Sequence, residues 1–281
     1  NGCPPASGCR RTPSSTSLHS GDDRMVSRLR WVAGVVFLAA IQGEAATTER
    51  ARPENGIAFQ TIIDLEQSAR LIAILLDSGR SVINENQSLF DDPAKADKGF
   101  TPDLFERQLA RMFRDRSGLD LPELDSARVP PAAKKWLKDL LTVSKQVVKD
   151  AQPEINQPAA RSKLIPAVFG SRVAGRFTEQ TGVQLKQTAL TPRNPANAPD
   201  AVERSALEIF AAPDYPREKT ITEAMAKTGL VRLMYPLYMT RQCLECHGEP
   251  KGTLDKTGYP REGLRLGQNA GAISVAIRMS P

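Results

Sequence analysis

The spacing of apolar residues changes along this chain from a helical period to simple alternation. Up to about residue 181 they recur every three or four positions, which predicts amphipathic helices. The first helix has no proline between Gly56 and Phe90, so it is expected to be one long helix, bent near Gly79. Further helices are expected at residues 101–118, 131–151 and 165–181.

Beyond residue 182, polar and apolar residues alternate in short runs that predict β-strands. A run at 183–190 precedes a proline-rich loop, after which Asp200 can cap a helix over 201–211. Three more strands are expected at residues 220–226, 230–237 and 270–277. The pattern therefore predicts an α+β fold: long N-terminal helices, then a small antiparallel sheet with helices on one side.

The first 46 residues differ from the rest and are interpreted as a leader ahead of a single domain at 47–281. Residues 25–46 have the features of a secretory signal peptide, including a positive start and an apolar run of 11 residues from Trp31 to Ile41. That run is shorter than the roughly 20 residues of a membrane-spanning helix, although an uncleaved membrane anchor is the alternative. Residues 1–24 are expected to be a disordered extension or over-translated leader. The domain is then expected in the periplasm.

Composition narrows the class of function. With 40% hydrophobic and 25% charged residues, the 281-residue chain has the composition of a soluble globular protein. Its net charge of +6 comes from basic residues interspersed with acidic ones, which is typical of solvated helix faces and leaves open a docking patch for an acidic redox partner. No basic segment carries interleaved aromatic residues, so a nucleic-acid partner is not expected.

The strongest chemical signal is Cys243-Leu244-Glu245-Cys246-His247, the attachment signature of a c-type haem. Two thiols one helical turn apart can form thioethers with the two vinyl groups of one porphyrin, and His247 can then reach the iron as an axial ligand. Once the leader is removed, Cys243 and Cys246 are the only cysteines and His247 is the only histidine. One covalent haem c is therefore expected.

Three other interpretations of the motif explain less of the chain. A zinc site usually has about four ligands, and the remaining Cys3, Cys9 and His19 all lie in the leader. A thioredoxin-like motif would open a longer helix than Gly248 and Pro250 allow. A structural disulfide would leave the adjacent histidine unexplained.

Several stretches of the chain match motifs of a known family. They are Lys186-Gln187-Thr188, the loop from Pro192 to Asp200, Tyr235-Pro236-Leu237, the stretch from Cys243 to Pro250, and Gly271-Ala272-Ile273-Ser274-Val275. With them the chain resembles, from about Ile57 to Ile277, the single-haem PAS-like c-type haem family, also found as the extracytoplasmic sensor domain of some bacterial histidine kinases. The resemblance implies a PAS-like sheet that holds one covalent haem and serves redox or ligand sensing.

The chain departs from that family at the second iron ligand. Members can use a cysteine of the long N-terminal helix, but this sequence has none between Cys9 and Cys243. Met239 would raise the potential if it ligated the iron, whereas Asn86 and Gln87 could line an open distal face. We expect an open or weakly six-coordinate iron that can bind a small gas, with the distal ligand itself unidentified.

Two residues of the proline-rich loop are candidate contacts to a haem propionate. They are Arg193 and Asn194, of which the first carries a guanidinium that matches a carboxylate with two parallel hydrogen bonds. The alternative is that Arg193 only holds the carbonyl groups of its own loop.

The function expected from these features is redox or small-ligand sensing by a haem protein that is not an enzyme. A sensor of this kind needs a redox partner protein or a separate signalling partner. The alternative is a soluble periplasmic electron-transfer cytochrome. A peroxidase-like enzyme is disfavoured because the chain offers no distal histidine. The long first helix could also pair two subunits into a homodimer.

Overall fold

The computed structural model describes residues 54–156 and 164–279. The expected leader and signal peptide, residues 1–24 and 25–46, lie outside these ranges, and so do the first residues of the expected domain. Among the described residues, no helix combines the length and the apolar character needed to cross a bilayer.

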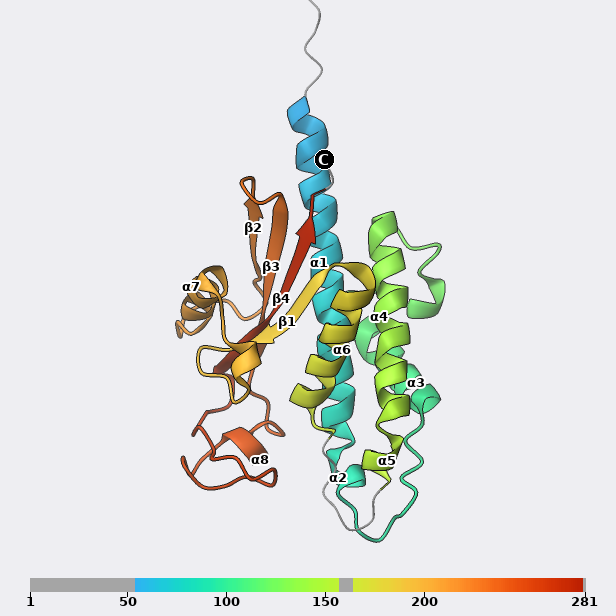
Figure 1. The fold of residues 1–281 in the computed structure, drawn as a ribbon, viewed down its shortest axis with the longest axis vertical. Helices are drawn as coiled ribbons and strands as arrows, with labels where there is room; N and C mark the ends of the chain where they lie inside the picture. The colour runs from blue at the N-terminus through green and yellow to red at the C-terminus, as the bar shows by residue number, and fades with distance from the viewer. Residues whose placement is uncertain (1–53, 157–163, 280–281) are drawn as a thin grey trace, which may run out of the picture. The chain divides into compact units, whose positions relative to one another are not determined.

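Helices make up the first half of the described chain (Figure 1). They are α1 (Glu54–Glu85), α2 (Gln87–Phe90), α3 (Pro102–Ser117), the 3₁₀ turn η1 (Leu121–Glu123), α4 (Pro131–Asp150), α5 (Gln152–Ile155) and α6 (Pro166–Thr181). α1 contacts α3, α4 and α6, and their apolar faces form one core that includes Phe105, Leu137 and Phe169. The helices predicted from apolar spacing are confirmed, except that the first ends at Glu85 and the short helix α2 covers the rest of its predicted range.

Local chemistry sets the ends of several helices. The hydroxyl of Thr101 accepts a hydrogen bond from the Leu104 amide at 3.2 Å and so caps the start of α3. Gly118 ends that helix at φ +73°, a left-handed conformation that glycine adopts without steric penalty. Asp200 caps the later helix α7 (Ala201–Phe210) through the Glu203 amide at 2.8 Å. The cap at Asp200 was predicted from sequence, and Thr101 and Gly118 stand at the two ends of the helix predicted over 101–118.

α1 runs as one helix through Gly79, where the sequence predicted a bend. The glycine allows close packing, because a Cβ atom there would lie 2.8 Å from Cε1 of Phe169 in α6. A side chain at this position would push the two helices apart. The requirement for glycine therefore comes from the contact between α1 and α6.

A four-stranded antiparallel sheet forms the second half of the described chain. Its strands are β1 (Gln184–Thr188), β2 (Ile221–Met225), β3 (Leu230–Tyr238) and β4 (Asn269–Arg278), in the spatial order β1-β4-β3-β2. The strands fall where alternation predicted them, and the α+β fold class is confirmed.

Helices cover both faces of this sheet, which corrects the expectation of helices on one side. α1 and α6 pack on one face, where Leu233 and Ile273 join the main core. α7 packs on the other face, where Phe210 and Met234 are buried together. Neighbouring residues of a strand point to opposite faces, so the apolar pair Leu233-Met234 requires a cover on each side.

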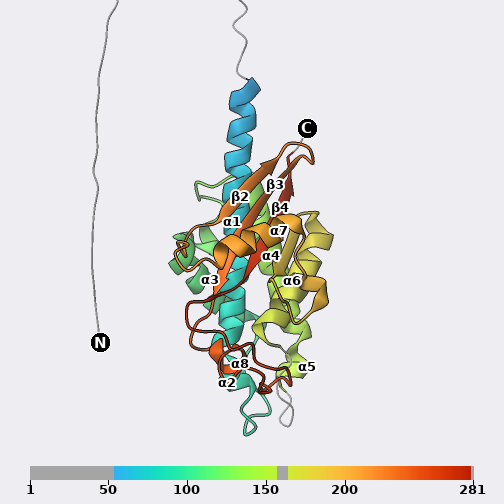
Figure 2. The same ribbon diagram turned by 90° about the vertical axis from the view of Figure 1, so that its left-hand side faces the viewer.

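The segment between β3 and β4 carries the cysteine motif and leaves the sheet beyond the ends of the strands (Figure 1). Its single helical turn, α8 (Leu244–His247), lies at the same end of the fold as α2 and the last turn of α1 (Figures 1 and 2). Lys256 of the same segment contacts Asp91, the residue after α2, at 2.5 Å. The motif is thereby brought against the helical half of the chain.

Candidate functional site

The motif forms one turn of helix that is held by its own backbone. The His247 amide donates to the Cys243 carbonyl at 3.0 Å, and the Gly248 amide donates to the Leu244 carbonyl at 2.9 Å. A Cβ atom at Gly248 would lie 2.6 Å from the Leu244 carbonyl oxygen, so a larger residue would disrupt the turn. The spacing of the two cysteines thus becomes one helical turn, as the sequence predicted.

Cys243 and Cys246 are free, partly exposed thiols on the wall of a cavity. The hydroxyl of Thr240 lies 3.1 Å from the Cys243 sulfur. Burial raises the pKa of the Cys246 thiol, and the negative charge of Asp255 raises it further. The two sulfurs are not joined to each other, so the structure does not support the disulfide interpretation of the motif.

His247 is oriented by a carboxylate from the loop that follows the motif. Its Nδ1 atom lies 2.8 Å from Oε2 of Glu262, and its carbonyl accepts a hydrogen bond from the Leu264 amide at 2.8 Å. A carboxylate beside Nδ1 favours the tautomer that carries the proton there, which leaves the lone pair on Nε2. Metal-ligating histidines are commonly oriented in this way.

Arg193 ties the proline-rich loop to the motif segment. Its Nη1 donates to Asp255 at 2.6 Å, and its Nε and Nη2 donate to the two carboxylate oxygens of Glu262 at 2.5 and 2.9 Å. Nη2 also donates to the Cys246 carbonyl at 2.9 Å. One guanidinium therefore connects the loop, the motif backbone and the carboxylate that orients His247.

The two carboxylates bound by Arg193 are held in their charged form. Burial would raise the pKa of Asp255, but hydrogen bonds from Thr257 and Arg193 outweigh it and bring the pKa well below its usual range. Burial would likewise raise the pKa of Glu262, and hydrogen bonds from Arg193 and His247 lower it instead. Arg193, Asp255, Glu262 and His247 thus form a charged network on the motif side of the cavity, the motif wall. Its charged groups find their hydrogen-bond partners within the protein.

These contacts bear on the propionate contacts expected from sequence. Arg193 makes four hydrogen bonds to the protein itself, but they go to Asp255, Glu262 and the Cys246 carbonyl and not to carbonyl groups of its own loop, as the alternative had expected. Asn194 accepts a hydrogen bond from the Ala196 amide at 3.0 Å and caps the 3₁₀ turn η2 (Pro195–Asn197). It is not among the residues that line the cavity. A propionate contact by either residue stays a prediction.

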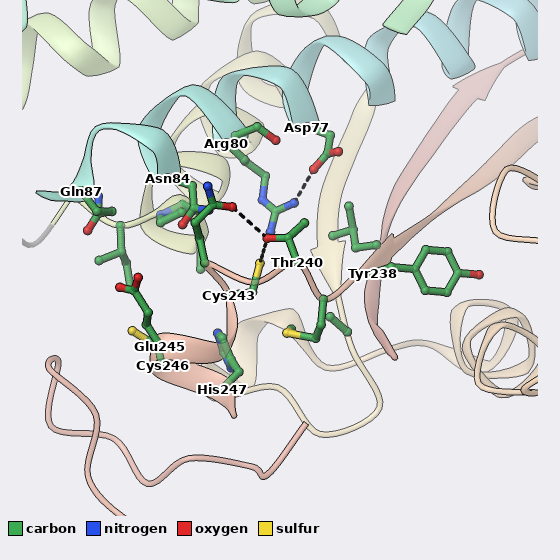
Figure 3. A pocket seen from close by; sticks show the side chains of 18 of the residues that line it. Asp77, Arg80, Asn84, Gln87, Tyr238, Thr240, Cys243, Glu245, Cys246 and His247 are labelled. Atoms are coloured by element: carbon green, nitrogen blue, oxygen red, sulfur yellow. Dashed lines mark hydrogen bonds and ion pairs between the residues drawn. The ribbon is translucent and has the colours of Figure 1, made fainter. Parts of the chain in front are cut away.

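A cavity of about 550 Å³ lies between the motif and the C-terminal half of α1 (Figure 3). This volume falls within the roughly 300–1,000 Å³ that is common for small-molecule and cofactor sites. Cys243, Cys246 and His247 line one side, and a row of polar residues faces them. The row consists of Asp77, Arg80, Ser81 and Asn84 from α1 and Gln87 and Ser88 from α2.

α1 therefore serves the core and the site with opposite faces. Apolar residues such as Ile72, Leu76 and Ile83 are buried in the core. The polar row, spaced three and four residues apart, lines the cavity, as expected for an amphipathic helix. The sequence left open whether this helix was only core or also crossed the cofactor, and its two faces allow both.

The residues expected on the distal side are separated by the structure. Gln87 lines the cavity, and its Nε2 donates to the Leu164 carbonyl at 2.9 Å. Asn86 does not line it, because its Nδ2 donates to Gln108 of α3 at 2.8 Å. Successive helical positions differ by about 100°, which accounts for the different directions of two neighbours. Met239 is buried and also lines the cavity.

The arrangement suits a metal carried by another molecule better than a bare ion. Within the described ranges, no group of three or more His, Cys, Asp or Glu side chains is placed to hold a metal ion. A structural zinc site needs about four such ligands. The motif offers instead two thiols that can be alkylated and one imidazole nitrogen that can ligate.

Three residues of this site were missed by sequence reasoning: Arg80, Asp255 and Glu262. The two acids lie in a loop without periodicity, where no local signal marks them. Arg80 follows Asp77 by three positions on the polar side of a predicted amphipathic helix. That spacing was an available signal.

A protein-family model named Tll0287-like matches residues 59–278. The chain belongs to the Tll0287-like family. Among solved structures, this Tll0287-like chain is similar to the crystal structure of the cyanobacterial heme-protein Tll0287 at 20% identity, over 52% of this chain and 92% of that one, with a TM-score of 0.38. A search of curated proteins finds no match. The match establishes the family, while haem binding and the PAS-like and kinase-sensor features stay predictions.

Proposed function

We propose that this Tll0287-like chain binds one haem c, joined to Cys243 and Cys246 by thioether bonds and ligated by His247. Support comes from two free thiols one turn apart and from the adjoining cavity of about 550 Å³. The contact of His247 with Glu262 carries the proposal, because it leaves Nε2 as the ligating atom. The family also takes its name from a protein that is described as a heme-protein, which supports the proposal further.

When bound, haem would supply a redox-active iron, which His247 would hold. The residues of this chain position it. Glu262 holds the proton on Nδ1 of His247, and Arg193 holds Glu262 together with the carbonyl of Cys246. The ligand is therefore oriented before the iron arrives, which lowers the entropic cost of ligation.

The α1 wall supports an open position opposite His247. Members of the family that the chain resembles can use a cysteine of this helix as a second ligand, but here Asn84 and Gln87 line the cavity. Amides are weak ligands for iron, so the position is left for a small gas or for a redox-dependent ligand. The resulting function is redox or small-ligand sensing, relayed to a redox partner protein or a separate signalling protein.

Met239 supports the second candidate, a soluble periplasmic electron-transfer cytochrome. Its side chain is 7% exposed and lines the same cavity. A thioether on the iron would close the sixth position and raise the potential, as suits outer-sphere electron transfer.

Further parts of the proposal rest on the sequence. They are export to the periplasm through residues 25–46, a PAS-like character of the sheet, and a role without catalysis. Pairing of two subunits through α1 is supported by Phe59 and Ile63, which lie one turn apart with exposed fractions of 66% and 42%.

Optical spectra of the purified, exported protein test the choice between the two functions. An open site predicts a high-spin ferrous form that binds carbon monoxide quickly. The electron carrier would be favoured by a low-spin form that does not bind carbon monoxide. That form should become high-spin in Met239→Ala. Met112→Ala is the matched control, because Met112 of α3 packs against the main hydrophobic core and does not line the cavity.

A further inference from the structure

One carboxylate on the α1 wall is shared by two arginines. Oδ1 of Asp77 accepts a hydrogen bond from Nη1 of Arg80 at 2.7 Å, and Oδ2 accepts one from Nη1 of Arg116 at 2.8 Å. Arg116 also donates through Nη2 to the Ser81 hydroxyl at 2.9 Å. Two guanidiniums against one carboxylate leave this group with an excess positive charge beside the cavity.

Arg80 leaves most of its donors unused. A guanidinium has five N–H groups, and within the described part of the chain Arg80 makes one hydrogen bond, to Asp77. Its Nε is buried without a partner, and its side chain is 19% exposed. Because that atom has almost no accessible surface, a guest in the cavity can reach only the donors of Nη1 and Nη2 that Asp77 leaves unused. Figure 3 shows the guanidinium projecting from α1 toward the side of Thr240 and Cys243.

Tyr235 adds a neutral donor to the same wall. Burial raises the pKa of its phenol, and the charge of Asp77 raises it further, while Arg116, Arg70 and Arg80 act in the opposite direction. The net result is a raised pKa, so the hydroxyl stays protonated near neutral pH. It can donate a hydrogen bond to an anion.

The other charged side chains of the cavity do not compete for this role. Arg193 and Lys256 are bound to carboxylates of the motif loop and of the residue after α2. The remaining charged lining residues are exposed: Glu85, Arg217 and Glu245. Arg116 is exposed as well, so Arg80 is the partly buried cation of this lining that shares its carboxylate with a second guanidinium.

We infer that Arg80, positioned by Asp77 and backed by Arg116, is the anion-binding residue of this cavity and takes a carboxylate or small oxyanion through paired N–H donors. The inference rests on the proposed haem for the identity of the guest. The anion is either a propionate of that haem or a free anion bound at its iron. Arg193, the sequence candidate for this role, has its donors engaged by the protein.

The test compares the haem-loaded wild type with Arg80→Gln and Arg80→Lys. Arg111→Gln on the exposed face of α3 is the matched control, since it makes the same charge change away from the cavity. Two quantities are measured on each protein. They are the dissociation constant of nitrite from the ferric form and the propionate bending band in the resonance Raman spectrum.

A free anion at the iron predicts about tenfold weaker nitrite binding in Arg80→Gln, the factor that corresponds to one charge-assisted hydrogen bond. Arg80→Lys should lose less, because it keeps the charge without the planar fork. A propionate partner predicts a shifted bending band with unchanged nitrite binding. Either pattern supports the anion site and identifies its source. Arg80→Gln behaving like Arg111→Gln in both measurements would overturn it.

Failure of the proposed function would be seen separately, as a wild-type protein without covalent haem. The anion site is then judged on the same proteins by titration with protoporphyrin and with its dimethyl ester. Tighter binding of the diacid by the wild type, lost in Arg80→Gln, supports a carboxylate site. An equal preference in both proteins would overturn it.

Discussion

The two walls of the cavity use arginine in opposite ways. On the motif wall, Arg193 serves two carboxylates and a backbone carbonyl. On the α1 wall, Arg80 and Arg116 share the single carboxylate of Asp77. The first wall is satisfied within the protein, and the second has unused donors. The number of acceptors around an arginine, and not its nearness to a motif, therefore decides whether it holds the fold or meets a guest.

Removing the cation of the motif wall should have the largest effect on stability. Arg193→Ala leaves the buried carboxylate of Asp255 without its ion-pair partner, and breaking a buried pair on one side costs about 3 kcal/mol. We expect that loss in the free energy of unfolding, measured by urea denaturation of the protein without haem. Arg111→Ala should change it by less than about 0.5 kcal/mol. A loss below about 1 kcal/mol in Arg193→Ala would contradict the comparison.

Lowering the pH should reduce the stability that the motif wall contributes. The pKa of Asp255 is lower in the folded protein than its unfolded value of about 3.9, so the folded state binds fewer protons and stability rises with pH. The contribution, on the order of 2 kcal/mol, is present above about pH 4 and is lost as the pH falls toward the folded pKa.

Stability measured between pH 5 and pH 2 checks this window. Asp255→Asn should flatten the decline, whereas Asp115→Asn, an exposed residue of α3, should leave it unchanged. Parallel curves for the wild type and Asp255→Asn would show that this carboxylate does not carry the acid sensitivity.

The Glu262→Gln variant tests whether the charge of Glu262 affects the midpoint potential through His247. An amide oxygen can still accept from Nδ1 of His247, but without the negative charge that makes the imidazole a stronger donor to ferric iron. The midpoint potential of the haem-loaded protein should rise, on the order of 60 mV for a tenfold loss of preference for the ferric form. Spectroelectrochemistry measures it, with Glu249→Gln as control. An unchanged potential would separate Glu262 from the iron ligand.

The α1 wall should show the smallest change in stability. Arg80→Ala leaves Asp77 paired with Arg116, and both side chains of the broken pair keep some solvent exposure. We expect a loss of less than about 1 kcal/mol in the same urea experiment. If Arg80→Ala costs as much as Arg193→Ala, then Arg80 holds the fold and the two walls do not differ.

The elements of the fold could be predicted where local chemistry marks their ends. Thr101, Gly118 and Asp200 each act through residues within one turn, so their roles are legible in sequence. The two-sided cover of the sheet was missed because a strand pattern shows that both faces are apolar at Leu233-Met234 without showing which helix covers each. The packing role of Gly79 was missed for the same reason, since the ring it accommodates belongs to α6.

The residues of the site also fall into two groups: those that the local sequence marks and those that only the fold brings together. The cysteine motif is contiguous, so its chemistry could be predicted. Glu262 and Asp255 reach their partners only through the return of the chain from β3 to β4. The apolar period of the first helix predicts which face packs into the core. It does not predict what the opposite, polar face, which carries Arg80, will contact. Arg193 was singled out by its loop, although its partners lie more than 50 residues away.

The intact mass of the exported protein under denaturing conditions tests the central claim most directly. Covalent attachment through Cys243 and Cys246 predicts a mass increase of one haem per chain that survives denaturation. The increase should be lost in the double variant Cys243→Ala/Cys246→Ala. A wild-type mass equal to that of the polypeptide alone would contradict covalent haem binding. Haem that stays attached in the double variant would contradict the assignment of these two thiols.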